Sequence, residues 1–202
     1  AVDTAIVGHV LGERSLAAIG ACASIFEMMV GFSNSMGSGF SIVISRAFGS
    51  GDEEKMKKAI AASIVIGIFT SVVITLLSLV GLGPLLKLIN TPDAIFDESL
   101  RYITIIGVFI VVMFTYNLCS GILRSIGNSV MPLVFLIFSS LLNIVLDYSF
   151  IKFFGMGVAG AAIATVIAQG VSAVLCIIYI FTKVKILVPE KHHFAAGKEV
   201  YM

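Results

Sequence analysis

The chain has 202 residues, of which 58% are hydrophobic and only 12% are charged, and its mean hydropathy is +1.08. A soluble domain carries about 25% charged residues, and a core of this size cannot bury so many long apolar runs. The composition therefore excludes an ordinary soluble domain and predicts an all-α integral membrane protein. A formal net charge of +1 provides no basic surface for nucleic acid, which is excluded as a partner.

Six hydrophobic segments follow one another along the chain, separated by short polar stretches. The first is short and already contains Asp3, so we expect the chain to begin partway along a helix. The second exceeds the roughly 20 residues that a bilayer requires, and it should tilt or project beyond the membrane. The predicted spans cover residues 1–11, 15–45, 59–86, 102–123, 131–151 and 161–182, which form a lobe over 1–185, and a polar linker follows at 186–202.

Lysine and arginine are distributed unevenly between the two sets of loops that these spans define. Basic residues accumulate on the cytoplasmic side of membrane proteins, so the richer set and the C-terminal tail are predicted to be cytoplasmic. The chain is therefore expected in the cell membrane, with its first span running outward. The richer set contains Arg46, Lys55, Lys57, Lys58, Arg124, Lys183, Lys185, Lys191 and Lys198, and the other contains Arg14, Lys87, Arg101 and Lys152.

Two aspartates, Asp3 and Asp147, lie within the predicted spans. An ionised Asp near the bilayer centre costs on the order of 2.5 to 3.5 kcal/mol, so such a residue usually faces a partner or a water-filled cavity. Asp3, Asp147 and Thr165 each lie about five residues from the predicted outer end of their span. At a helical rise of about 1.5 Å per residue, all three are expected roughly 7 to 8 Å below the outer boundary.

Asn143 adds a further oxygen close to this level. It lies one turn deeper than Asp147 on the same helix face, because residues four apart stack on a helix. Two carboxylates, an amide oxygen and a hydroxyl can thus converge, and these hard oxygens suit Na⁺ or a shared proton. Two nearby carboxylates in a low dielectric need a counter-charge, which either cation supplies. The alternative is that each aspartate bonds to helix backbone or lies at a wet interface.

A stripe of small and polar residues, headed by Glu27, follows one face of the second predicted span. Such a stripe either lines a cavity or allows another helix to pack closely, and the sequence leaves both interpretations open. The other members of the stripe are Gly31, Asn34, Ser38, Ser41 and Ser45.

No residue set typical of an enzyme is found, because no nucleophile and base share a common depth. Residues 155–160 have the spacing G-x-G-x-x-G but lack the preceding strand that a dinucleotide site requires, and no cofactor is expected. Cys22, Cys119 and Cys176 lie in apolar runs and are interpreted as packing residues. His192 and His193 lie in the tail and are not placed for a proton relay inside the membrane.

Several short motifs occur in a fixed order along the chain. They are Val2-Asp3-Thr4 with Gly8, Gly37-Ser38-Gly39 followed by Ser45-Arg46-Ala47 and Gly49-Ser50-Gly51-Asp52, Leu123-Arg124-Ser125-Ile126-Gly127-Asn128, Asn143-Ile144-Val145-Leu146-Asp147, and Gly157-Val158-Ala159-Gly160-Ala161-Ala162 with Thr165 and Gln169. Up to about Lys185, the set resembles the first half of a multidrug and toxic compound extrusion (MATE) transporter. Ser125 and Asn128 depart from the family's commoner Gly and Asp, which leaves the substrate contacts open.

The resemblance implies a fold of twelve helices in two six-helix lobes, of which this chain is the N-terminal lobe with its first helix truncated. It also implies a cation-coupled antiporter, driven by H⁺ or Na⁺, that exports organic and often cationic compounds. Membrane lipid and the missing second lobe are the implied partners. In the DinF-like branch, the cation site uses positions that match Asp3, Asn143, Asp147 and Thr165, with a backbone carbonyl at Ala161.

Glu27, Asn34 and Tyr116 are expected to face the substrate cavity of such a transporter. An alternative function is a lipid-linked oligosaccharide flippase of the same superfamily, which would hold a pyrophosphate with basic residues in its cavity. No predicted span carries a buried Lys or Arg, which argues against this alternative.

Overall fold

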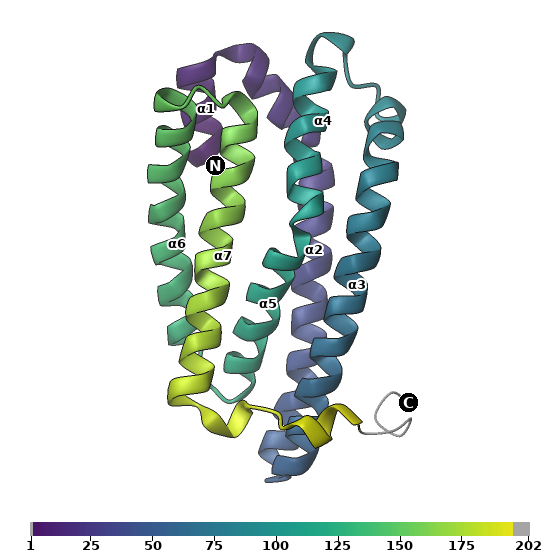
Figure 1. Cartoon of the computed structure of the whole chain (residues 1–202), viewed down its shortest axis with the longest axis vertical. Coiled ribbons are helices and arrows are strands. Elements are labelled where there is room, and N and C mark those ends of the chain that lie inside the picture. Colours follow the sequence, from purple (N-terminus) through teal and green to yellow (C-terminus); the bar gives the residue numbers. More distant parts are fainter. Residues whose placement is uncertain (1, 196–202) are drawn as a thin grey trace.

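The computed structural model describes residues 2–195, apart from the side chains of residues 2, 3, 191 and 195. All regular elements in this range are helical, and they form one bundle (Figure 1). They are α1 (Val2–Leu11), α2 (Glu13–Gly49), α3 (Glu53–Leu88), α4 (Asp93–Val108), α5 (Ile110–Ser125), α6 (Val130–Tyr148), the π-helical turn η1 (Ser149–Phe153), α7 (Gly157–Lys183), and the 3-10 helices η2 (Lys185–Leu187) and η3 (Lys191–Ala195). The all-α prediction is confirmed.

Four segments of the described chain are single helices long and apolar enough to cross a membrane: α2, α3, α6 extended by η1, and α7. The bent pair α4 and α5 provides a fifth if it is counted as one span. With the short α1, these elements correspond to the six predicted segments. At about 1.5 Å per residue, the 37 residues of α2 extend well beyond a hydrocarbon core of about 30 Å, as its sequence predicted.

Helix α3 begins earlier than the predicted third span, which started at residue 59. Only residues 50–52 connect the two helices, because Asp52 caps α3 by accepting a hydrogen bond from the Lys55 backbone N–H at 2.9 Å. Glu53 and Glu54 then lie in the first helical turn, where a carboxylate is favourable to the helix dipole. The charged residues within 53–58 are therefore part of helix α3.

The fourth predicted span, residues 102–123, is not one straight helix. The chain becomes helical at Asp93 and bends by 46° between α4 and α5, at Phe109. The hydroxyl of Thr75 on α3 lies 3.5 and 3.4 Å from the carbonyl oxygens of Gly107 and Val108, next to the break. A side chain that binds carbonyls freed at a break offsets part of the cost of the bend in lipid.

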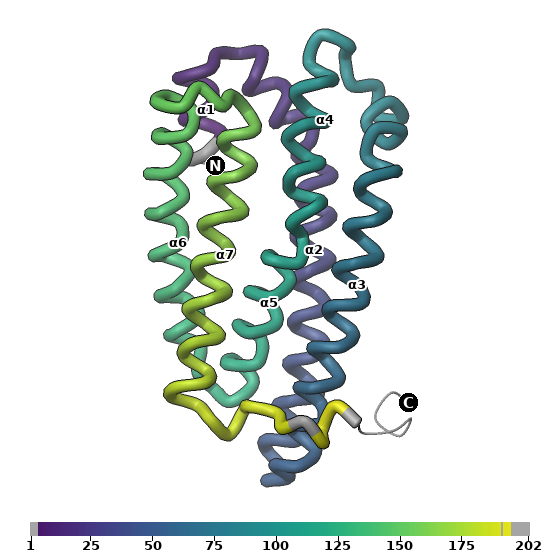
Figure 2. Tube along the Cα trace, viewed as in Figure 1, coloured from purple at the N-terminus to yellow at the C-terminus, as the bar shows by residue number. Residues whose placement is uncertain are grey.

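The connections between helices lie at two opposite ends of the bundle. Figure 2 shows the α1–α2, α3–α4 and α6–α7 connections at one end, and the α2–α3 and α5–α6 connections with the C-terminal segment at the other. The two sets of loops that differ in basic residues are therefore at opposite ends. Which end faces the cytoplasm stays a prediction.

Buried apolar side chains form two clusters. One lies among α1, the first half of α2, the end of α3, α4 and the start of α7, and it contains Cys22. The other lies among the end of α2, the start of α3, α5 and the end of α7, and it contains Cys119 and Cys176. All three cysteines are buried and free, as expected of packing residues.

Helices α2 and α5 come into backbone contact where both carry glycine. A Cβ atom at Gly121 would lie 2.7 Å from the carbonyl oxygen of Gly37, and one at Gly37 would lie 2.9 Å from that of Asn117. Ser41 strengthens this crossing, because its hydroxyl donates a hydrogen bond to the carbonyl of Gly121 at 2.9 Å. Small residues permit such close approach of helices in a membrane.

Replacing Gly121 by alanine should therefore separate α2 from α5 and destabilise the protein by about 1 to 3 kcal/mol, the usual cost of an overpacked contact. The matched control is Gly39→Ala on α2, since nothing lies within 4 Å of a Cβ there. The measurement is the thermal midpoint of the full-length protein in detergent. Equal midpoints for the two variants would contradict the close contact.

Candidate functional site

A polar cavity of about 460 Å³ opens between α2, α5, α6 and α7. Asn34 and Tyr116, which were expected to face a substrate cavity, contribute to its lining, and so do Asn143 and Thr165 from the predicted cation site. The structure therefore brings these four residues to one cavity. The remaining lining residues are Phe26, Val30, Met113, Asn117, Ser120, Arg124, Leu136, Ser139, Ser140, Ala168 and Gln169.

Helical spacing explains why these side chains share one cavity. Each helix contributes residues at steps of three or four, such as Ser139 and Asn143 on α6 or Thr165 and Gln169 on α7. Residues with this spacing lie on one helix face. An otherwise apolar helix thus keeps its few polar side chains on the face away from lipid.

Asp147 is completely buried near the end of α6, one helical turn beyond Asn143. Helix α1, which carries Asp3, packs against both α6 and α7. The side chain of Asp3 lies outside the described part of the structure, so its predicted pairing with Asp147 stays a prediction. The π-helical turn η1 begins two residues after Asp147, and such turns occur frequently at functional sites.

Thr165 and Ala161, two further residues of the predicted cation site, are in direct contact. The hydroxyl of Thr165 donates a hydrogen bond to the carbonyl of Ala161 at 3.0 Å. The hydroxyl oxygen of Thr165 retains two lone pairs with which it could bind a cation or accept a proton. The Ala161 carbonyl lies inside α7 and also accepts a helical N–H, so it could bind a cation only if the Thr165 hydroxyl turned away. Within the described residues, the buried side-chain nitrogen of Asn143 has no hydrogen-bond partner. A buried amide of this kind requires water or a ligand, which fits a position at the edge of a polar cavity.

Several lining residues were not selected from the sequence as cavity residues. Asn117 and Gln169 are amides on apolar helices, and this is the same signal that singled out Asn143. The side chain of Asn117 donates to the Met113 carbonyl at 2.9 Å. Arg124 reaches the lining from the last turn of α5, although its side chain is exposed. Among the described buried residues there is no Lys or Arg.

Glu27 does not line this cavity and is exposed on α2. The stripe that it heads serves more than one purpose, because Asn34 lines the cavity while Ser41 supports the contact with α5. The intervening positions form a shallow, open groove of about 540 Å³ on the surface of the lobe, which includes Gly31 and Ser38. Both interpretations of the stripe therefore apply, each to different members.

Comparison with known proteins identifies the family. A family model described as MatE matches residues 1–149. The probable multidrug resistance protein YpnP of Bacillus subtilis is 30% identical over 187 residues, which cover 89% of this chain and 40% of that protein. The multidrug export protein MepA of Staphylococcus saprophyticus is 25% identical over 194 residues, which cover 96% of this chain and 43% of that protein.

Solved structures agree with this match. A crystal structure of MATE in the bent conformation has a TM-score of 0.93 and 26% sequence identity, and the superposition covers 99% of this chain and 45% of that one. The chain thus spans less than half the length of these relatives. Because the family model matches most of the chain and the helices superpose on a solved member, the chain belongs to the MatE family and corresponds to one lobe of a MATE transporter.

Proposed function

We propose that this chain is the N-terminal lobe of a cation-coupled antiporter that exports organic, often cationic, compounds across the cell membrane. The observation that carries the proposal is a polar cavity inside an apolar lobe, one turn of α6 away from the fully buried carboxyl group of Asp147. Family membership supports it, and so do relatives whose names state multidrug resistance or multidrug export. The lobe resembles those of the DinF-like branch in its predicted cation ligands.

The coupling cation would bind at the end of the cavity where α1, α6 and α7 meet. Asp147 and Asp3 would supply negative charge, and Asn143, Thr165 and the carbonyl of Ala161 would supply neutral oxygens. H⁺ or Na⁺ would enter from outside and neutralise the carboxylates, which removes the cost of holding charge in a low dielectric. Coupling then requires that the cation bind one conformation of the transporter better than the other.

The cavity would receive the exported compound on the side of α2 and α5. Its volume of about 460 Å³ lies within the range of about 300 to 1,000 Å³ that is usual for ligand pockets, and the second lobe would add further surface. Asn34, Asn117 and Gln169 offer hydrogen bonds, and Tyr116 adds an aromatic wall. No metal or organic cofactor is part of the proposal, apart from the coupling ion.

The alternative, a flippase for lipid-linked oligosaccharides, requires basic side chains deep in the cavity. Among the described residues that line the cavity, the basic one is Arg124. Its side chain is exposed at the end of α5, so it does not place a positive charge deep in the cavity. A pyrophosphate deep in this cavity would meet amides and hydroxyls but no compensating charge. The chemistry therefore favours export of organic compounds over flipping of a pyrophosphate-linked lipid.

Replacing either aspartate should abolish cation-driven export in the full-length protein. Asp147→Asn and Asp3→Asn remove the charge that a proton or Na⁺ would neutralise, while they preserve side-chain volume. Export of ethidium from energised cells or vesicles is the measurement, at matched levels of protein in the membrane. The control is Asp93→Asn, because Asp93 is exposed at the start of α4. Normal export in both test variants would refute the proposed cation site.

The identity of the coupling ion can be measured in proteoliposomes. If Na⁺ is the ion, an inward sodium gradient should drive export after the pH gradient has been collapsed with an ionophore. If H⁺ is the ion, an inward proton gradient should drive export in sodium-free buffer. Transport that responds to neither gradient would contradict antiport of these cations.

The proposed orientation places the α2–α3 connection in the cytoplasm and the start of α4 outside. In whole cells, a membrane-impermeant maleimide should therefore label an Asp93→Cys variant, whereas a Ser50→Cys variant should react only after permeabilisation. Both positions are exposed, and the three native cysteines of this lobe are buried, which keeps the background low. The reverse pattern would show that the basic loops face outward.

A further inference from the structure

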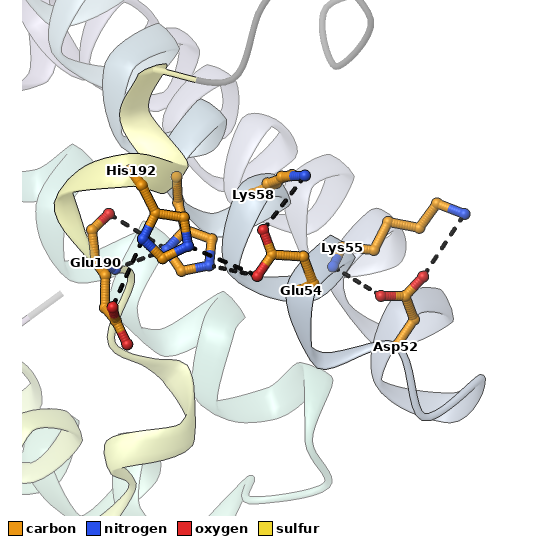
Figure 3. Close-up of polar contacts among 7 residues, drawn as sticks. Asp52, Glu54, Lys55, Lys58, Glu190 and His192 are labelled. Atoms are coloured by element: carbon orange, nitrogen blue, oxygen red, sulfur yellow. Dashed lines mark hydrogen bonds and ion pairs between the residues drawn. The ribbon is translucent and has the colours of Figure 1, made fainter.

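The C-terminal segment folds back against the start of α3 and brings three potential metal ligands together (Figure 3). Glu54 lies in the first turn of α3, and His192 and His193 lie on η3. One ligand atom from each of the three residues lies within 4.8 Å of the other two. These residues are far from the polar cavity in sequence and contribute nothing to its lining.

The two histidine–carboxylate distances are close to the spacing that a tetrahedral metal ion requires. His193 Nε2 lies 3.1 Å and His192 Nε2 lies 3.7 Å from the same oxygen, Glu54 Oε2. In a tetrahedral zinc site with bonds of about 2.0 to 2.1 Å, neighbouring ligand atoms are about 3.3 to 3.4 Å apart. The two histidine ligand atoms lie within 4.8 Å of each other, and the imidazole rings stack with centroids 3.8 Å apart and 34° between their planes. The two rings must therefore turn away from each other before an ion can bind all three atoms.

Glu190 provides the outer partners that histidine ligands of metals usually have. His193 Nδ1 lies 3.3 Å from the backbone carbonyl oxygen of Glu190, to which an Nδ1–H can donate. In that tautomer, Nε2 carries a lone pair directed toward Glu54. The carboxylate of Glu190 lies 3.6 Å from His192 Nδ1 and can orient that ring in the same way.

The surroundings fix the site on one side and leave it open on the other. The His193 side chain is only 1% exposed, whereas those of His192 and Glu54 are 58% and 55% exposed. Lys58 forms an ion pair with the other carboxylate oxygen of Glu54 at 3.3 Å, which leaves Oε2 directed toward the histidines. An ion can enter from solvent, and water can occupy its fourth position.

We propose that Glu54, His192 and His193 form a binding site for a divalent transition-metal ion of the Zn²⁺ class, which fastens the C-terminal segment to the start of α3. Two imidazoles and one carboxylate are a ligand set that suits Zn²⁺ and its first-row neighbours. The bound ion joins residues 139 positions apart in the sequence. It thereby holds the segment that follows α7 against the same end of the bundle as the α2–α3 connection.

The same residues offer a metal-free arrangement, and the experiment must distinguish the two. His193 Nδ1 can accept a hydrogen bond from the Glu190 backbone N–H at 2.9 Å, so that Nε2–H donates to Glu54 at 3.1 Å. In this tautomer Nε2 has no free lone pair, and the segment is held by hydrogen bonds alone. Metal binding requires the proton to reside on Nδ1 instead.

The test uses the full-length transporter, purified without a polyhistidine tag and stripped with a chelator. Isothermal titration with Zn²⁺ near pH 7.5, and the visible absorption spectrum after addition of Co²⁺, measure binding and coordination geometry. Wild-type protein should bind one ion at this site and give an intense tetrahedral Co²⁺ spectrum. Glu54→Gln and His192→Ala, both at exposed positions, should each weaken binding by more than about 10-fold.

The matched controls are Glu53→Gln, next to Glu54 and paired with Lys57, and His9→Ala on α1. Both should bind Zn²⁺ like the wild type. Hydrogen exchange of residues 190–195 gives a second readout, and it should slow with Zn²⁺ and recover with chelator. Identical binding in all variants, an octahedral Co²⁺ spectrum, or protection that depends on pH but not on metal would overturn the proposal. None of these readouts requires transport activity.

Discussion

The inability of lipid to form hydrogen bonds determines how this lobe is built, because every polar group in the membrane must find a partner inside the protein or in trapped water. Several buried serine hydroxyls find a hydrogen-bond acceptor within their own helix. The hydroxyls of Ser33, Ser63 and Ser71 each donate to the carbonyl four residues earlier in the same helix. Thr75 reaches across to the break between α4 and α5. Further polar side chains, among them Asn34, Asn143 and Gln169, line the cavity.

This constraint gives the cavity its chemical character. The two apolar clusters occupy opposite halves of the bundle, and the amides and hydroxyls collect between α2, α5, α6 and α7. Asp147 is the costliest group of all, and it lies at the edge of this polar region instead of in either cluster. In the proposed antiport, a proton or Na⁺ would remove the cost of holding this charge, and its binding would thereby change the relative stability of the two conformations.

Patterns that are local in the sequence predicted much of this architecture. Features that depend on contacts between distant segments were not predicted. Helical spacing predicted a common depth for Asp3, Asp147 and Thr165, with Asn143 one turn deeper. Of these residues, Asn143 and Thr165 line the same cavity. The bend at Phe109 was not predicted, and the contact beside it joins Thr75 on α3 to carbonyls more than 30 residues away in the sequence. The helical start of α3 has a local signal, Asp52 before two glutamates, but the predicted span was bounded by hydrophobicity and therefore excluded these charged residues.

Because lipid cannot form hydrogen bonds, the outer surface of the lobe consists of two kinds of region, one apolar and one polar. Helices α3 and α6 expose large apolar side chains, such as Leu77 and Leu141, and these surfaces suit lipid. The exposed face of α2 instead presents Asn34 and Ser38 in an open groove, which lipid cannot satisfy. We infer that this face meets cavity water or the second lobe, whose presence is expected from relatives more than twice as long as the matched segment.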